Sequence, residues 1–243
     1  MEINDKLGEI LQRKKVNLRA SCDCGNRGCM KCATAFEMYL KLASANVPIK
    51  YWDKTIDDLD EANGTVKAKV QEYCLKLPKV LDRGMGLFLV GSNGVGKTLT
   101  ASIILREALH QKFSARFTTL AEILTMSSDG MYDQEARKQY RRELIEVDFL
   151  VIDDITKTYK NTDKQSSTYI DTQFDYLFRT RANANLPVIV TSNHRREDAL
   201  KSADETLSNS LLSLFAEHLK DITFLGKDRR IGNDRQQGSS ASS

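Results

Sequence analysis

The sequence predicts an α/β fold in which helices cover both faces of a parallel sheet, with a small cysteine-rich module ahead of it. Three observations support this class. Short apolar runs alternate with helical segments from residue 65 onward, a glycine-rich loop joins one run to a helix, and four cysteines gather near the N-terminus. Strands separated by helices pair in parallel and bury both faces of their sheet. The 243 residues suffice for one full domain and a small one.

The composition indicates a soluble globular protein, with 41% hydrophobic and 28% charged residues. No apolar run reaches the length of a membrane span, and "MEINDKLGEI" lacks the pattern of a signal peptide. We therefore expect a cytoplasmic protein with no membrane partner, in which cysteines are metal ligands more often than disulfides. The formal net charge of +3 is too small to indicate nucleic-acid binding by itself.

The predicted strands are short strand-like segments that alternate with helical ones. They are "GLFLV" (86–90), "ARFTT" (115–119), "DFLVI" (148–152), "PVIVTS" (187–192) and "DITFL" (221–225).

Four segments divide the chain. Residues 1–45 are predicted to form an N-terminal, metal-binding and partner-binding module, and residues 46–64 a linker in which Pro48 interrupts any helix. Residues 65–232 form the predicted nucleotide-binding core, and residues 233–243 have the composition of a disordered tail. The module and the core are expected to have separate hydrophobic cores.

The loop "GSNGVGKT" (91–98) has the G-x-x-x-x-G-K-T pattern of a phosphate-binding loop. It lies between a predicted strand and the helical run "LTASIILREALHQK", which is the context that this loop requires. Its glycines allow successive backbone N–H groups to converge on phosphate oxygens at a helix N-terminus. Lys97 is predicted to reach the β- and γ-phosphates of ATP, and the Thr98 hydroxyl to bind Mg²⁺. The predicted nucleotide-binding residues of the loop are Gly91, Ser92, Asn93, Gly94, Val95, Gly96, Lys97, Thr98 and Leu99.

Two further strands end in polar residues that suit the same site. "FLVIDD" (149–154) runs from four apolar residues into two carboxylates. Asp153 is predicted to hold Mg²⁺ through water, and Asp154 to polarise the attacking water. "VIVTSN" ends in Asn193, which is placed to position that water or to contact the γ-phosphate. The alternative is a buried strand that ends in a solvated acidic turn, and "TSN" alone is also a common loop start.

Together these motifs resemble the AAA+ ATPases, and among them the helicase loaders of the DnaC/DnaI type and their relatives, the IstB-type transposition ATPases. The resemblance covers residues from about 48 to 231. "GSNGVGKT" is similar to the Walker A motif, "FLVIDDI" to Walker B and "VIVTSN" to sensor 1. "GKDRR" (226–230) looks like the closing G-x-x-x-R element, which makes Arg230 the candidate sensor 2 arginine.

The resemblance implies an ATP-dependent loader that places a replicative helicase hexamer on single-stranded DNA and that forms a homo-oligomer when ATP is bound. Its implied cofactors are ATP and Mg²⁺. Two other functions stay open: an IstB-like ATPase that regulates transposition, and a nucleotide-gated adaptor with little hydrolysis.

The sequence departs from the family pattern at two points. Many AAA+ enzymes have glutamate as the second Walker B acid, whereas this chain has Asp154, which predicts slow hydrolysis. The stretch that matches the usual arginine-finger region, "SLLSLFAEHL" (210–219), contains no arginine. Arg179 and Arg181 are alternative fingers, or else exposed arginines at a helix end.

The cluster "CDCGNRGCMKC" has the spacing C-x-C-x4-C-x2-C. Its cysteines Cys22, Cys24, Cys29 and Cys32 are predicted to bind a structural Zn²⁺ tetrahedrally. An iron–sulfur cluster or free thiols remain alternatives. Cys74 lies in a predicted helix and is expected in the core.

A basic run, "ARKQYRREL" (136–144), contains Arg137, Lys138, Arg141 and Arg142 on one predicted helical face. Such a face could follow a phosphate backbone, although many runs of this kind are only solvated helix surfaces.

Overall fold

The computed structural model describes residues 2–24, 28–59, 64–155, 164–200, 205–226 and 228. Two of the sequence predictions, the sensor 2 role of Arg230 and the tail 233–243, lie outside these residues. No helix in the described ranges is long and apolar enough to cross a membrane.

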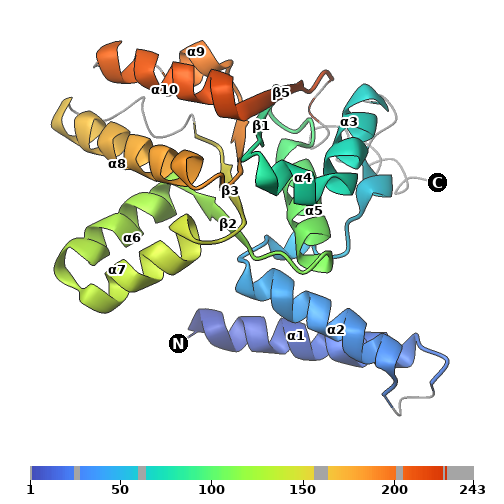
Figure 1. Cartoon of the computed structure of the whole chain (residues 1–243). Coiled ribbons are helices and arrows are strands. Elements are labelled where there is room, and N and C mark those ends of the chain that lie inside the picture. The colour runs from blue at the N-terminus through green and yellow to red at the C-terminus, as the bar shows by residue number, and fades with distance from the viewer. Residues whose placement is uncertain are drawn as a thin grey trace, which may run out of the picture.

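A five-stranded parallel sheet forms the centre of the molecule, as predicted, and its strand order is β2-β3-β4-β1-β5 (Figure 1). All five predicted strands are present, and the last begins two residues earlier than its sequence pattern indicated. The strands are β1 (Gly86–Val90), β2 (Ala115–Thr119), β3 (Phe149–Asp153), β4 (Val188–Ser192) and β5 (Leu219–Thr223). Because all strands are parallel, the loops that follow β1, β3 and β4 meet at one edge of the sheet.

Helices cover both faces of this sheet. Successive strand residues alternate between the two faces, so that Phe149 and Val151 pack into one core and Leu150 and Ile152 into the other. Helices α3 (Gly64–Leu75) and α5 (Lys97–His110) cover the first face. Helices α6 (Leu120–Tyr132), α8 (Lys164–Asn183) and α10 (Glu205–His218) cover the second. The remaining elements of the core are α4 (Leu77–Asp82), α7 (Gln134–Tyr140), the π-helical turn η4 (Arg141–Ile145) and α9 (Arg196–Ala199). Cys74 is buried in the first core, as predicted.

The N-terminal residues form a helical hairpin of α1 (Glu2–Ala20) and α2 (Met30–Ser44), whose tip extends away from the sheet (Figure 1). The expectation that this module has a core of its own is wrong. Leu42 of α2 belongs to the same buried cluster as the α5 side chains, and Leu7 and Ile10 of α1 pack against that cluster. The hairpin contributes too few apolar residues to fold around them alone, so it buries them against the α/β core instead.

The segment after the hairpin is folded and packed. It contains the 3₁₀ turns η1 (Ile49–Tyr51) and η2 (Ile56–Asp58), and between them Trp52 is 1% exposed. The Trp52 ring stacks on Tyr39 of α2 at 5.9 Å between centroids, and its Nε1 donates to the Val47 carbonyl at 2.8 Å. Arg106 of α5 donates to the Lys54 carbonyl at 2.7 Å. These contacts fix the segment between the hairpin and α5.

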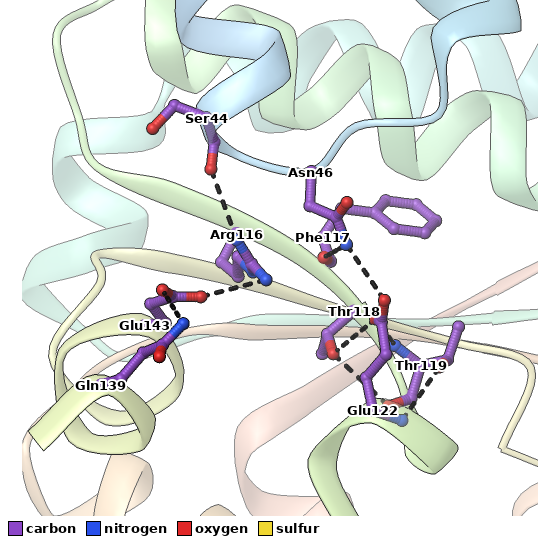
Figure 2. Close-up of polar contacts among 9 residues, drawn as sticks. All are labelled: Ser44, Asn46, Arg116, Phe117, Thr118, Thr119, Glu122, Gln139 and Glu143. Carbon is purple, nitrogen blue, oxygen red and sulfur yellow. Dashed lines mark hydrogen bonds and ion pairs between the residues drawn. The ribbon is translucent and has the colours of Figure 1, made fainter. Parts of the chain in front are cut away.

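A group of hydrogen bonds and one ion pair, here called the polar joint, connects the end of α2 to the edge strand β2 and its neighbours (Figure 2). The N–H of Phe117 in edge strand β2 donates to the Ala45 carbonyl at 2.7 Å. The Asn46 side-chain amide donates to the Phe117 carbonyl and to Glu122, each at 3.2 Å. Arg116 pairs with Glu143 at 3.0 Å and also donates to the Ser44 carbonyl. Asn46 has a left-handed backbone (φ 57°), which asparagine tolerates better than most residues. The joint therefore closes an edge that would otherwise expose unpaired backbone groups.

Candidate nucleotide-binding site

The glycine-rich loop has the backbone that a phosphate-binding loop needs. Gly94 (φ 73°) and Gly96 (φ 105°) both adopt the left-handed region, and α5 begins directly afterwards at Lys97. A Cβ at Gly94 would lie 1.7 Å from Oδ1 of Asp228, so the Asp228 side chain would have to move to admit one. Backbone N–H groups at the start of α5 have no carbonyl partner within the helix, so this end of the helix can attract an anion.

Lys97 lies inside the loop and is 8% exposed. Its Nζ donates to the Gly91 carbonyl at 2.8 Å, to the Ser92 carbonyl at 2.7 Å and to Oδ1 of Asn193 at 2.8 Å. The loop thus holds the ammonium group beside its own backbone, at the place where it can exchange these acceptors for phosphate oxygens.

Thr98 and Asp153 meet across the sheet edge. The Thr98 hydroxyl donates to Oδ1 of Asp153 at 3.0 Å, and its Oγ1 lies 3.3 Å from Oδ2. A hydroxyl and a carboxylate oxygen are hard oxygen donors, which Mg²⁺ prefers. The pair predicted from the sequence to hold Mg²⁺ is therefore assembled in the fold.

Asp154 and Asn193 also lie together. Asp154 has a left-handed backbone (φ 53°), and Nδ2 of Asn193 donates to its Oδ1 at 3.3 Å. The other amide atom of Asn193 accepts the bond from Lys97. A chain of hydrogen bonds from Lys97 through Asn193 to Asp154 therefore connects the loop to the carboxylate that directly follows β3.

These side chains line one cavity of about 300 Å³. Its wall includes the predicted residues Asn93, Gly94, Gly96, Lys97, Thr98, Leu99, Asp153, Asp154 and Asn193. Three more lining residues escaped the sequence analysis: Lys50, Tyr51 and Thr191. Lys50 and Tyr51 come from η1, in a segment that the sequence analysis assigned to a linker. Thr191 had a weak signal, because it is a polar residue within the otherwise apolar run "VIVTS".

The two arginines proposed as fingers have different environments. Arg181 is 0% exposed, and its guanidinium donates to the carbonyls of Leu144, Ile145, Val147, Asp148 and Pro187. Burial lowers the pKa of this guanidinium to about 9. The suggestion that Arg181 acts across a subunit boundary is therefore wrong, since its donors are committed inside the protein. Arg179 is partly exposed and pairs with Asp175 at 2.7 Å.

The cysteine cluster lies at the tip of the hairpin, between α1 and α2. The Sγ atoms of Cys22, Cys24, Cys29 and Cys32 all lie within 4.8 Å of one another. The separations are 3.5 Å for Cys22–Cys29, 3.7 Å for Cys24–Cys32 and 3.8 Å for Cys29–Cys32. Metal–sulfur bonds of 2.3 Å in a tetrahedron put the sulfurs about 3.8 Å apart. The four thiols thus lie close enough together to bind one tetrahedral metal ion.

Three of the four predicted DNA-contacting side chains have partners within the protein. Arg137 donates to the Gly130 carbonyl at 3.0 Å, Lys138 pairs with Glu135 at 3.3 Å and Arg141 pairs with Glu146 at 2.7 Å. The helix also changes to a π-helical turn at Arg141, so the four residues do not share one regular α-helical face. These contacts weaken the case for a phosphate-binding surface here.

Comparison with solved structures shows the same fold. The structure of DnaI covers 75% of this chain and 94% of its own, with a TM-score of 0.60 and 20% identity. The DnaC helicase loader covers 73% of this chain and 100% of its own, with a TM-score of 0.58 and 17% identity. Domain III of the Thermotoga maritima replication initiation protein DnaA has a TM-score of 0.57, with 18% identity over 79% of this chain and 73% of its own.

Sequence relatives lead to one family. Two IS21-like putative ATP-binding proteins of insertion sequences, from Bacteroides fragilis and its strain YCH46, are 32% and 30% identical to this chain over 116 residues. The aligned part is 48% of this chain and 43% or 56% of those proteins. Residues 33–237 match the family described as IstB-like ATP binding protein. This match includes the loop, both acidic residues and Asn193, and the chain belongs to the IstB-like ATP-binding family, with the AAA+ fold that DnaI and DnaC share.

Proposed function

We propose that this protein is an ATPase that loads a replicative helicase hexamer onto single-stranded DNA. The observation that carries the proposal is the position of the four-cysteine hairpin: its tip extends away from the sheet, while its base shares a core with the nucleotide site. A loader needs this combination of a partner-binding surface and a nucleotide switch in one rigid unit. The fold shared with the DnaC helicase loader supports the same reading.

ATP would bind in the cavity between the glycine loop and η1. The N-terminal N–H groups of α5 and the Lys97 ammonium would hold the phosphates, because both place positive charge in a partly desolvated site. Lys50 and Tyr51 line the opposite part of the cavity and offer a cation and an aromatic face. Nucleotide there would touch the segment that carries the hairpin.

Hydrolysis would depend on residues that are already in place. Asp153 and Thr98 would hold Mg²⁺, which supplies charge neutralisation at the phosphates when bound. Asp154 would accept a proton from the attacking water, and its bond to Asn193 keeps the carboxylate beside the loop. Because the Asp154 side chain is shorter than the usual glutamate, we expect slow turnover. In a homo-oligomer, a neighbouring copy of the chain would supply the finger arginine, and Arg179 is the candidate.

The metal of the hairpin is proposed to be Zn²⁺, because four thiolates in a tetrahedral set suit zinc. The hairpin tip has no large core, so the metal would supply much of its folding free energy.

Replacement of Cys29 by serine is expected to abolish metal binding, from about one Zn²⁺ per chain to none, and to fray the tip of the hairpin. Nucleotide affinity should stay within about twofold, because Leu7, Ile10 and Leu42 hold the far end of the hairpin to the core. Elemental analysis of the purified protein and nucleotide titration measure the two effects. Cys74→Ser is the control, since it removes a buried thiol outside the cluster. A wild-type protein free of metal, with the hairpin still folded, would contradict the zinc proposal.

The partner surface is expected to include Met30. This residue begins α2 beside the cysteine cluster and is 82% exposed, which is unusual for a large apolar side chain. A metal-fixed tip presents such a side chain at a small entropic cost. Deletion of the whole module would be a poor test, because it would also uncover the shared core.

Met30→Glu is therefore the test of helicase loading. Binding of the ATP-loaded protein to the host's replicative helicase hexamer, measured by size-exclusion chromatography and titration, should weaken at least about tenfold. Metal content and ATP affinity should not change. Met131→Glu is the matched control, because Met131 is 58% exposed on α6 and lies outside the hairpin. If the wild-type protein does not bind the hexamer at all, helicase loading is excluded.

A second function is favoured by the sequence relatives, which are ATP-binding proteins of IS21-like insertion sequences. A regulator of transposition would bind duplex DNA and a transposase instead of a hexameric helicase. Competition between duplex and single-stranded DNA of the same length separates the two functions. A loader should prefer the single strand, and preference for the duplex would favour the transposition function.

A further inference from the structure

We propose that Thr191 of β4 is a positioning residue that sets both acidic side chains of the nucleotide site. The proposal rests on the nucleotide-binding part of the proposed function, and it assigns a role to a residue that the sequence analysis did not single out. Thr191 is 1% exposed and lines the cavity.

The Thr191 hydroxyl bonds to two neighbouring residues at once. It donates to Oδ1 of Asp153 at 2.6 Å and accepts the backbone N–H of Asp154 at 2.9 Å. A hydroxyl has one donor and two acceptor positions, so both bonds can form together. The bond to Asp153 is short because its acceptor is a carboxylate.

These bonds replace regular sheet pairing at the end of β3. The ladder between β3 and β4 ends at the pair Ile152–Val190. The next residue of β4 is Thr191, whose side chain binds Asp153 and the N–H of Asp154, while its carbonyl accepts the N–H of Ile155 at 3.2 Å. Asp154 therefore leaves the strand with φ 53°, a left-handed conformation that most residues other than glycine adopt only at an energetic cost. Thr191 stabilises that conformation with its hydroxyl and its carbonyl.

Two consequences follow for the site. First, the Asp153 carboxylate accepts hydrogen bonds from the hydroxyls of Thr191 and Thr98, and these bonds hold the side chain in one rotamer beside the loop. Second, the left-handed turn directs the Asp154 carboxylate to Asn193. The hydroxyl of Thr191 thus acts on Mg²⁺ binding through Asp153 and on the water-polarising group through Asp154.

The test is Thr191→Val, which keeps the β-branched shape and removes the hydroxyl. The Mg²⁺ concentration that gives half-maximal ATP affinity should rise about tenfold, because loss of a residue that hydrogen-bonds a metal ligand typically weakens metal binding by about tenfold or more. ADP affinity in EDTA, without Mg²⁺, should stay within about twofold of wild type. Thr191→Ser retains the hydroxyl and should restore most of the Mg²⁺ response.

Thr118→Val is the matched control. Thr118 is equally buried, in strand β2, and its hydroxyl donates to Glu122 at 3.0 Å, away from the cavity. It should lower the melting temperature without changing the Mg²⁺ requirement. If Thr191→Val shifts only the melting temperature, or weakens binding equally with and without Mg²⁺, the positioning role is excluded. If the wild-type protein binds ATP with no Mg²⁺ dependence, the metal part of the proposed function fails instead.

Discussion

Replacement of Lys97 by alanine is expected to weaken ATP binding at least about 100-fold, a loss of about 3 kcal/mol or more. The Lys97 ammonium is 8% exposed and already lies among the loop carbonyls, so its charge acts on the phosphates in a site with little water. Hydrogen bonds that involve a charged donor in such surroundings are the strongest that the site offers. Lys50, the other lysine of the cavity wall, comes from η1 and not from the phosphate-binding loop.

Isothermal titration with a slowly hydrolysed ATP analogue measures this effect directly. Lys79→Ala is the matched control, since Lys79 is an exposed lysine of α4 outside the cavity. The melting temperature of Lys97→Ala should be recorded as well, because the substitution also removes the bonds to the Gly91 and Ser92 carbonyls. A folded Lys97→Ala protein with unchanged ATP affinity would contradict the assignment of the loop as the phosphate site.

Replacement of Arg181 by methionine is expected to destabilise the protein by roughly 4–5 kcal/mol, enough to unfold many domains. The guanidinium links the end of η4 (Leu144 and Ile145) to residues before β3 (Val147 and Asp148) and before β4 (Pro187). Methionine has a similar apolar length but no donor, so several buried carbonyls would lose their partner. Each unsatisfied buried acceptor costs about 1–3 kcal/mol.

Arg179→Met supplies the control, two residues earlier on the same helix. Arg179 makes an exposed ion pair with Asp175, and such pairs contribute about 0–1 kcal/mol. Urea denaturation of both variants measures the difference. If the two variants are equally stable, the structural role of Arg181 is wrong. A fall in ATP turnover without loss of stability in Arg179→Met would identify it as the finger arginine.

Local sequence patterns predicted the chemistry and the class of fold. The loop "GSNGVGKT", the pair Asp153–Asp154 and the cysteine spacing are each read within a few neighbouring residues. The three inner strands β3, β4 and β1 were predictable because a strand buried on both faces is a nearly continuous apolar run, whereas the edge strands β2 and β5 carry polar residues such as Arg116 and Lys220. From parallel order alone, Asp153 and Asn193 were expected at one edge of the sheet, and the structure brings them to the same cavity.

Only the tertiary structure decided which residues that are far apart in the chain contact one another. The role of Thr191 depends on the register that places it beside Asp153. The role of Arg181 depends on backbone carbonyls that precede two different strands. The periodicity of the sequence specifies neither arrangement. Lys50 and Tyr51 reach the nucleotide cavity only because Trp52 and Asn46 anchor their segment against α2 and β2. The hairpin was expected to fold apart from the core, yet it shares that core, because burial is gained wherever apolar surfaces meet and not only within a contiguous segment. Sequence spacing determines which groups are present, whereas packing of distant segments determines which of them act together.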